Sequence, residues 1–257
     1  MTFVNCKNTD SDKTIKKELL SQQQEFYQLK IYTFDTVEQM QITDKYLKEA
    51  YLPGLRKMGI QNIGVFKSRP SDTDTTKKTY VLIPFSSFEQ FLNLNEELEI
   101  DQTYITADND YINASHDKPP YRRIESIILK AFKTQPILQV PPQDSQRSNR
   151  IYELRSYESA TESKHKNKVD MFNVGGEVNL FNQLEFNAVF FGEVVSGSKM
   201  PNLMYMTTFS GQESRDTHWN LFKESPEWNE MKVLPKYQNN VSHADIMFLY
   251  PTEYSDY

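Results

Sequence analysis

The residues best suited to chemistry lie close together in the second half of the chain. Glu153, Arg155 and Tyr157 are spaced two apart, and side chains with this spacing on a strand point to the same face of its sheet. A guanidinium can hold a carboxylate or an enolate through two parallel hydrogen bonds, and a neighbouring phenol adds a further donor. Glu193 could act as a general base if desolvation raised its pKa. These residue types indicate that an anion could be bound or stabilised here.

A purely structural interpretation stands beside this one. Glu193 or Glu153 could form an ion pair with Arg155 that holds two sheets in register, because a buried charge needs a partner of opposite sign. The sequence assigns a catalytic role to no residue. The group is therefore predicted as a set of candidate ligand-binding residues, with structural ion pairing as the alternative.

No familiar catalytic or nucleotide-binding motif accompanies these residues. The eight glycines form neither G-x-G-x-x-G nor a P-loop, and the absence of G-x-S-x-G disfavours a hydrolase. The histidines His116, His165, His218 and His243 show no H-E-x-x-H spacing. His218 is expected at solvent or at a helix cap, with a haem or metal ligand as the alternative. The sequence thus predicts no metal site and no cofactor.

Composition narrows the class of protein. The 257 residues include 29 Lys and Arg against 35 Asp and Glu, for a formal net charge of −6. Such an acidic chain has no positive field to hold a phosphate backbone, so no nucleic-acid partner is expected. The mean hydropathy is −0.67, and no apolar run approaches the ~18 residues of a transmembrane helix. The single cysteine excludes an intrachain disulfide and a zinc site built on several thiolates.

The amino-terminal residues 1–24 are polar and lack a sustained period, which predicts a flexible leader. The expected location of the protein is cytoplasmic. An alternative follows from Cys6, whose polar continuation resembles the start of a bacterial lipoprotein. Lipidation of Cys6 would place the protein in the periplasm or at the cell surface.

The two halves of the chain resemble each other at an offset of 125 residues, as from Tyr27 to Tyr152. Self-similarity over tens of residues is the signature of a repeated structural unit. The same offset, shortened by one residue at the last pair, matches further positions: Leu29 with Leu154, Tyr32 with Tyr157, Asn62 with Asn187, Phe66 with Phe191, Tyr80 with Tyr205, and Phe85 with Phe209.

Each half has the same predicted order of elements, β-α-β-β-α-β. Alternating Tyr-, Ile- and Leu-rich segments predict strands, whereas a capping box at Ser87 and the Ser225-Pro226 pair predict helix starts. This order is typical of the ferredoxin-like split βαβ unit. The predicted fold is α+β, with a flexible leader at 1–24, a first ferredoxin-like repeat at 25–132, a proline-containing linker at 133–149 and a second repeat at 150–257.

Both helices of such a unit cover one face of its sheet, so the other face needs a partner. The two halves are expected to pack sheet to sheet as an α+β barrel. Alternation places Tyr152 and Leu154 in the apolar phase, which we assign to the face under the helices. The opposite phase would then fill the barrel lumen, and it contains the candidate ligand-binding residues Glu153, Arg155, Tyr157, Phe191 and Glu193.

Several of these motifs resemble the NIPSNAP family. The likeness rests on Tyr152-Glu-Leu-Arg-Ser-Tyr157, on Phe190-Phe191-Gly192-Glu193, and on the run from Met200 to Phe209. It implies the dimeric α+β barrel architecture, here with both halves in one chain. The first half departs from the pattern, with Gln28 and Lys30 in place of Glu153 and Arg155, so any site is expected to be asymmetric.

The resemblance implies a NIPSNAP-like protein without a settled activity, which binds a small anionic or aromatic molecule in the lumen or interacts with other proteins. The alternative it allows is a barrel monooxygenase or isomerase, cofactor-independent or haem-type, acting on such a molecule. Whether the chain is an enzyme is left open. A homo-oligomer is compatible with either reading, since strand edges or helix faces remain free.

Overall fold

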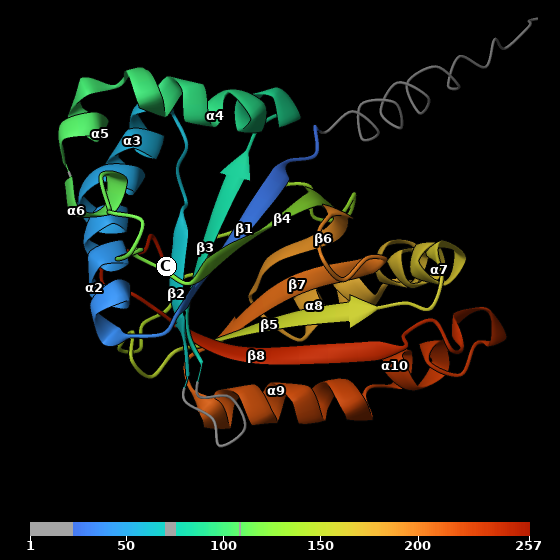
Figure 1. Cartoon of the computed structure of the whole chain (residues 1–257). Coiled ribbons are helices and arrows are strands. Elements are labelled where there is room, and N and C mark those ends of the chain that lie inside the picture. The colour runs from blue at the N-terminus through green and yellow to red at the C-terminus, as the bar shows by residue number, and fades with distance from the viewer. Residues whose placement is uncertain (1–22, 70–75, 108) are drawn as a thin grey trace, which may run out of the picture.

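In the computed structural model, which describes residues 23–69, 76–107 and 109–257, eight antiparallel strands close into a barrel with helices on its outside (Figure 1). The α+β class and the sheet-to-sheet barrel predicted from the sequence are confirmed at this level. The strands are β1 (Phe26–Phe34), β2 (Gly64–Ser68), β3 (Lys77–Phe85), β4 (Arg123–Ala131), β5 (Ile151–Glu158), β6 (Ala188–Ser196), β7 (Asn202–Phe209) and β8 (His243–Pro251).

The helices form two groups, one against each half of the barrel (Figure 1). The first group is α2 (Val37–Tyr46), the π-helical turn η1 (Leu47–Tyr51), α3 (Leu52–Lys57), α4 (Phe88–Ile100), α5 (Gln102–Ala107) and α6 (Asn109–Ile112). The second group is α7 (Glu162–Asn173), α8 (Glu177–Gln183), α9 (Gln212–Glu224), α10 (Pro226–Met231) and the 3₁₀ turn η2 (Pro235–Tyr237). Within the described residues, no helix combines the length and apolarity needed to cross a membrane.

The strand order around the barrel is β1-β3-β2-β8-β5-β7-β6-β4. Each half therefore contributes its strands in the same order, β4-β1-β3-β2 and β8-β5-β7-β6. The two sheets join through the β2–β8 and β4–β6 pairs, both antiparallel. Closure leaves no free edge strand, which removes the unpaired backbone groups that an open sheet exposes.

Side-chain caps fix where several helices begin. The hydroxyl of Ser87 accepts a hydrogen bond from the amide of Gln90 at the start of α4. Ser225 does the same for Trp228 at the start of α10, whose first residue is Pro226. These two starts match the prediction, because Ser accepts from the otherwise unbonded amides of the first turn.

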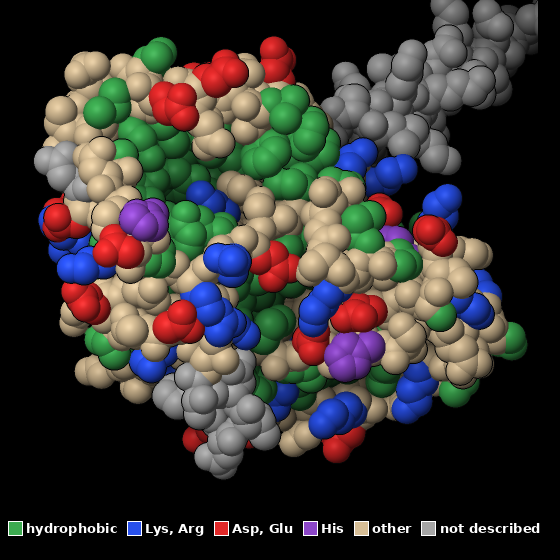
Figure 2. Space-filling model, in the orientation of Figure 1, with side chains coloured by type: hydrophobic (Ala, Val, Ile, Leu, Met, Phe, Trp, Pro, Cys, Tyr) green, Lys and Arg blue, Asp and Glu red, His purple; other side chains and the backbone are tan. Residues whose placement is uncertain are grey.

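Two exposed residues of α4, Phe88 and Leu92, contribute to the apolar surface visible over this helix (Figure 2).

The barrel lumen is filled with apolar side chains. Its buried residues come from all eight strands, and aromatic rings are prominent among them: Tyr27 packs on Phe190 at 5.5 Å between ring centroids, and Phe66 on Tyr152 at 4.9 Å. Leu154 also belongs to this cluster and has no exposed surface. The assignment of Tyr152 and Leu154 to the face under the helices is therefore wrong. An eight-stranded barrel has an interior just wide enough for side chains, so the apolar phase of each strand points inward.

Two further cores lie between the barrel and its helices. The first is centred on the side chains of β1, β3, α2, η1 and α3, and the second on those of β5–β7, α7, α8 and α9. Polar groups can be buried in these outer layers because a covering helix can supply hydrogen-bond partners.

The segment 133–149, predicted as a proline-containing linker, packs against the barrel. Leu138 is buried in the lumen cluster. Its amide donates to the carboxylate of Glu25 at 2.7 Å, and the amide of Gln139 donates to the carbonyl of Val189. The segment thus packs across one end of the barrel, because three prolines restrict its backbone without preventing burial of the apolar residues between them.

The 125-residue offset holds for only part of each half. Asn62 and Asn187 both adopt a positive φ, at 58° and 49°, and Leu29 and Leu154 occupy equivalent lumen positions. Leu29 pairs with Leu82 and Leu154 with Met206, however, so β3 and β7 correspond at an offset of 124.

The phase of β6 changes at an irregularity in its pairing with β7, between Ala188 and Phe190. As a result Phe66 lies in the lumen, whereas Phe191 lies under the helices. Tyr80 and Tyr205 also lie on opposite faces, because β3 and β7 correspond at an offset of 124 residues and not 125. An extra residue in one strand of an antiparallel pair turns every later side chain to the other face.

Replacing Leu154 by Ala should lower the free energy of unfolding by about 2–5 kcal/mol, because the filled lumen cannot collapse onto the cavity. Ile246→Ala is the matched control: Ile246 lies on neighbouring β8 and is 45% exposed, so its loss should cost less than about 1 kcal/mol. Urea unfolding followed by circular dichroism measures both. Equal losses would contradict an apolar lumen built on Leu154.

Candidate functional site

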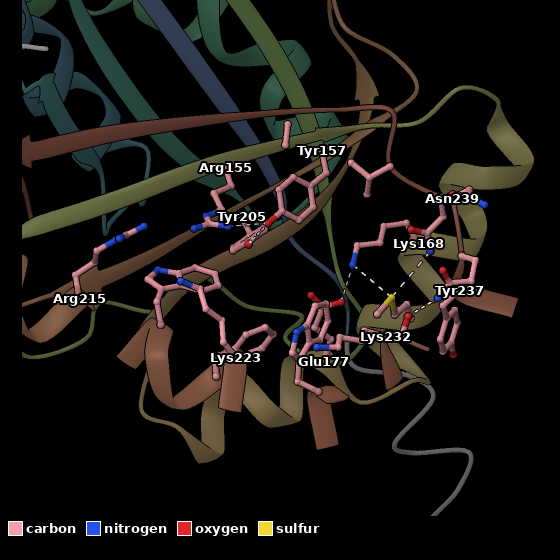
Figure 3. Close-up of a pocket in the computed structure, with 18 residues that line it drawn as sticks. Arg155, Tyr157, Lys168, Glu177, Tyr205, Arg215, Lys223, Lys232, Tyr237 and Asn239 are labelled. Atoms are coloured by element: carbon pink, nitrogen blue, oxygen red, sulfur yellow. Dashed lines mark hydrogen bonds and ion pairs between the residues drawn. The ribbon is translucent and has the colours of Figure 1, made fainter. Parts of the chain in front are cut away.

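A cavity of about 510 Å³ lies between the outer face of the second sheet and the helices that cover it. We call it the helix-side pocket. Its floor is β5 and β7, and its walls come from α7, α9, α10 and the η2 region (Figure 3). Aromatic rings and cationic side chains dominate the lining: Tyr157, Tyr205, Trp219, Phe222, Trp228, Tyr237, Arg155, Lys168, Arg215, Lys223 and Lys232.

A buried carboxylate organises one end of this pocket. Glu153 has no exposed surface, yet it accepts hydrogen bonds from three side chains. Arg155 Nε donates to Oε1 at 2.6 Å, Arg215 Nε to Oε2 at 2.8 Å, and Trp219 Nε1 to Oε2 at 2.9 Å. Arg215 and Trp219 are four residues apart on α9, so they lie on the same helix face. Glu153 thereby ties β5 to α9.

Burial by itself would raise the pKa of Glu153, since it disfavours the charged form. The hydrogen bonds and positive charges of Arg215 and Arg155 outweigh that effect, and the pKa of the carboxyl lies below its usual value. Glu153 is therefore ionised at neutral pH, and it cannot serve as a proton acceptor of moderate strength.

Arg155 is held between this carboxylate and an aromatic wall. Its guanidinium carbon lies 3.7 Å from the centroid of the Trp219 ring, a stacked arrangement that favours the cation. Its Nη1 also donates to the hydroxyl oxygen of Tyr157 at 2.9 Å. The guanidinium is nearly buried and fixed on three sides, so its orientation toward the pocket is set before any ligand arrives.

Two phenols lie next to Arg155, and one of their two hydroxyl protons has no acceptor within the described part of the chain. Tyr157 Oη and Tyr205 Oη are 2.9 Å apart, and either can be the donor, so one proton lies between them. The second hydroxyl proton has no acceptor within the described part of the chain, and both residues border the pocket. Burial raises the pKa of Tyr205 well above its usual value, which keeps that phenol protonated. The pair therefore offers one O–H donor beside a guanidinium.

A second ion pair borders the opposite end of the pocket. Lys168 Nζ and Glu177 Oε2 are 2.8 Å apart, and both residues are buried. The ammonium also lies 4.6 Å from the centroid of the Phe172 ring. Gly176 has a φ of 94°, a backbone conformation that glycine adopts readily, and it positions the start of α8 so that Glu177 faces α7.

The candidate residues predicted from the sequence all lie outside the lumen, under the helical layer, which corrects their placement. Arg155 and Tyr157 line the helix-side pocket, and Glu153 supports it from behind. Phe191 is buried in the core beneath α7 and α8. Glu193 is half exposed and pairs with His165 Nε2 at 3.1 Å, away from Arg155. Of the two predicted ion pairs, Glu153–Arg155 is present, whereas Arg155 contacts no other acid among its described partners.

Five charged residues that line the pocket were not predicted: Lys168, Glu177, Arg215, Lys223 and Lys232. Lys168, Glu177 and Arg215 belong to helices, where a charge usually means a solvated face. Arg215 could have been predicted from its spacing of four residues from Trp219, because this spacing places its guanidinium on the same helix face as a core aromatic residue. His218, expected at solvent or at a helix cap, is half-buried within α9, and its Nδ1 lies 2.6 Å from the carbonyl of Ser214, outside this pocket.

The first half has a different arrangement at the matching positions, as its departures from the pattern predicted. Lys30 lies 4.6 Å from the centroid of the Tyr51 ring, and Gln28 donates to Ser126. The space under the helices is filled by tyrosines, with Tyr46 stacked on Tyr111 at 3.7 Å between centroids.

The helix-side pocket does not fit a haem. Its lining contains neither histidine nor cysteine, the usual proximal ligands of haem iron. The sulfur of its one methionine, Met171, lies against the ammonium of Lys168 at 3.4 Å.

A separate group of possible metal ligands, Glu158, His243 and Asp245, lies at the barrel rim. Lys199 already forms an ion pair with Asp245 there and lies 3.8 Å from Glu158.

Neither a protein-family model nor the sequence of a curated protein matches this chain. Solved structures do resemble it. A candidate monooxygenase from Lactobacillus acidophilus has a TM-score of 0.54 at 12% identity, over 89% of this chain and 94% of its own. An anthrone oxidase-like protein has a TM-score of 0.50 at 8% identity, over 90% and 92%. These likenesses concern the fold alone, an α+β barrel of eight strands.

The NIPSNAP resemblance is supported only in part. A NIPSNAP-like domain protein from Burkholderia xenovorans covers 42% of this chain and 90% of its own, at 15% identity and a TM-score of 0.38. The candidate monooxygenase and the anthrone oxidase-like protein instead match about nine tenths of this chain.

Glu153→Gln should lower the free energy of unfolding by about 3 kcal/mol, because it leaves two guanidinium groups facing a neutral amide in a buried site. The matched control is Glu193→Gln, whose side chain is 40% exposed and whose loss should cost less than about 1 kcal/mol. Chemical denaturation at neutral pH measures both variants. Equal losses of unfolding free energy in the two variants would contradict the organising role of Glu153.

The cost of Glu153→Gln should also depend on pH. The pKa of Glu153 is lower in the folded state than its reference value of 4.5, so the carboxylate stabilises the fold above that pH and the contribution is lost as the pH falls through the folded pKa. The stability difference between wild type and Glu153→Gln should therefore shrink from about pH 6 to about pH 3. A constant difference would show that the ionised form contributes nothing.

Proposed function

We propose that this protein binds a small aromatic anion in the helix-side pocket. The observation that carries the proposal is the fixed group of Arg155, Tyr157 and Tyr205, which directs a guanidinium and an unsatisfied phenol proton at one end of the cavity. Hydrogen bonds between such donors and a charged acceptor are stronger than neutral ones. A carboxylate or enolate oxygen fits this end of the pocket.

The rest of the lining favours an aromatic body on that anion. Trp219, Phe222 and Trp228 form one wall, with Phe222 and Trp228 at 4.7 Å between centroids. Lys223 and Lys232 also line the pocket and add positive charge without a carboxylate partner among the described ion pairs. The cavity volume of about 510 Å³ lies within the usual range for small-molecule sites. Shape and charge therefore support the same class of ligand.

The binding proposal is tested with 2-naphthoate against its neutral isostere 2-naphthamide, by isothermal titration calorimetry. Naphthoate should bind more tightly than the amide. Tyr157→Phe should weaken naphthoate by about ten- to a hundredfold, the value of a hydrogen bond to a charged group, because it removes the hydroxyl and keeps the ring. Arg155→Ala is a poorer test, since it also removes the ion-pair partner of the buried Glu153 and would destabilise the fold.

Lys164→Gln is the control variant, since Lys164 is an exposed residue of α7 that does not border the pocket. Its affinity for naphthoate should equal that of the wild type. Equal binding of naphthoate and naphthamide by the wild-type protein would overturn the proposal.

An oxygenase or isomerase acting on such an anion is the second candidate. Preorganised donors next to a dry pocket stabilise negative charge that develops on oxygen, and Arg155 with Tyr157 has that form. The described lining contains one carboxylate, Glu177, which is paired with Lys168, so a free general base is missing there. Because catalysis would need such a base and binding does not, binding is the first candidate.

Oxygen uptake separates the two candidates. Anthrone and one O₂ give anthraquinone and one H₂O, so uptake can be matched to the product formed. The binding proposal expects no uptake above the rate in buffer. Uptake that is lost in Tyr157→Phe would establish the second candidate in its place.

We also propose that the two halves are ferredoxin-like repeats of common origin. The identical strand order of the halves and the positive φ at both Asn62 and Asn187 support this, together with the matching lumen positions of Leu29 and Leu154. The predicted boundaries at 25–132 and 150–257 follow the same division. The leader at 1–24, with Cys6, falls almost entirely outside the described residues.

A further inference from the structure

A smaller cavity of about 180 Å³ lies at the mouth of the barrel, on the inner face of the sheet. We call it the barrel-mouth cavity. Its lining combines charged and polar side chains at the rim with apolar side chains of the strands, among them Ile31, Ile127, Val194, Met204 and Met247. It is separated from the helix-side pocket by β5, because Ser156 faces the lumen whereas its neighbours Arg155 and Tyr157 face the helices.

Two buried polar residues lie among these apolar side chains. Asn202 and Ser156 are each 3% exposed, and Asn202 Nδ2 donates to Ser156 Oγ at 2.9 Å. Asn202 Oδ1 is buried and has no hydrogen-bond partner within the described part of the chain. A buried amide oxygen without a partner costs free energy that a bound group can recover.

The pair therefore presents one acceptor and one donor. Asn202 Oδ1 can accept a hydrogen bond. The hydroxyl proton of Ser156 is not used in its bond with Asn202, and it has no acceptor among the described residues. A hydroxyl group complements both atoms at once, since it donates through its proton and accepts through its oxygen.

The charges at the rim compensate each other. Lys199 forms an ion pair with Asp245 and lies 3.8 Å from Glu158, and Glu125 accepts a hydrogen bond from Ser198 at 2.5 Å. Acidic and basic side chains intermix around the hollow centre of this face (Figure 2). The lining of the cavity itself contains two lysines, Lys78 and Lys199, and two acids, Glu125 and Asp245, so it favours a neutral ligand.

We propose that the barrel-mouth cavity binds a small neutral alcohol, with its hydroxyl on Asn202 and Ser156 and its hydrocarbon chain against the apolar wall. The cavity is well below the ~300 Å³ at which drug-sized sites begin, which restricts the ligand to a short chain. This site does not depend on the anion proposed for the helix-side pocket, because it opens on the other face of β5.

The test uses hexan-1-ol and the methyl signals of methionines in protein labelled with [methyl-¹³C]methionine. Met204 and Met247 border the barrel-mouth cavity, whereas Met171 borders the helix-side pocket. Hexan-1-ol should shift the Met204 and Met247 signals saturably and leave Met171 in place. 2-Naphthoate should do the reverse, so failure of one site can be told from failure of the other.

Pentyl methyl ether is the matched control ligand, since it has the same number of heavy atoms and no donor. It should bind about tenfold more weakly, as expected for the loss of one hydrogen bond to a buried acceptor. Asn202→Leu and Ser156→Ala should each reduce the preference for the alcohol over the ether. Equal affinity for both ligands in the wild type, or the lack of a saturable shift, would overturn the proposal and leave a cavity that holds only water.

Discussion

Closure of the sheet is the constraint on which the rest of this structure depends. A closed barrel of eight strands has a narrow interior in which every backbone group is already paired, so the side chains at its centre must be apolar and must fill it. Tyr152, Leu154 and their counterparts on the other strands satisfy that demand. The charged phase of β5 is then forced outward, where α9 supplies the partners that the lumen could not provide.

Glu153 shows how this arrangement creates a site. Its carboxylate orders two arginines, one on its own strand and one on α9, and the indole of Trp219 completes the set. Because those contacts already satisfy the carboxylate, the outer face of Arg155 and the phenols beside it remain directed toward the cavity. The structural interpretation of the Glu153–Arg155 pair and the ligand-binding interpretation of Arg155 are therefore compatible: the ion pair fixes the group that meets the ligand.

The sequence could predict the eight strands, the order of elements and the pairing of the two sheets, because alternation, caps and the internal similarity all depend on local patterns. It could also indicate that Glu153, Arg155 and Tyr157 act together. It could not decide which phase faces inward, since each phase contains large aromatic residues and the choice depends on closure. The change of phase in β6 was equally hidden, as one extra residue leaves the composition of the strand unaltered. Lys168 and Glu177 meet only through the turn at Gly176, which no spacing rule anticipates.

The back-to-back arrangement across β5 has a further consequence. Consecutive residues of this strand belong alternately to two separate cavities, with Ser156 on one side and its neighbours on the other. A single inserted or deleted residue within β5 would turn a guanidinium into the dry interior and a leucine toward the helices. Natural variation in this strand should consequently proceed by replacement at fixed length, whereas changes in length should be confined to the loops that flank it.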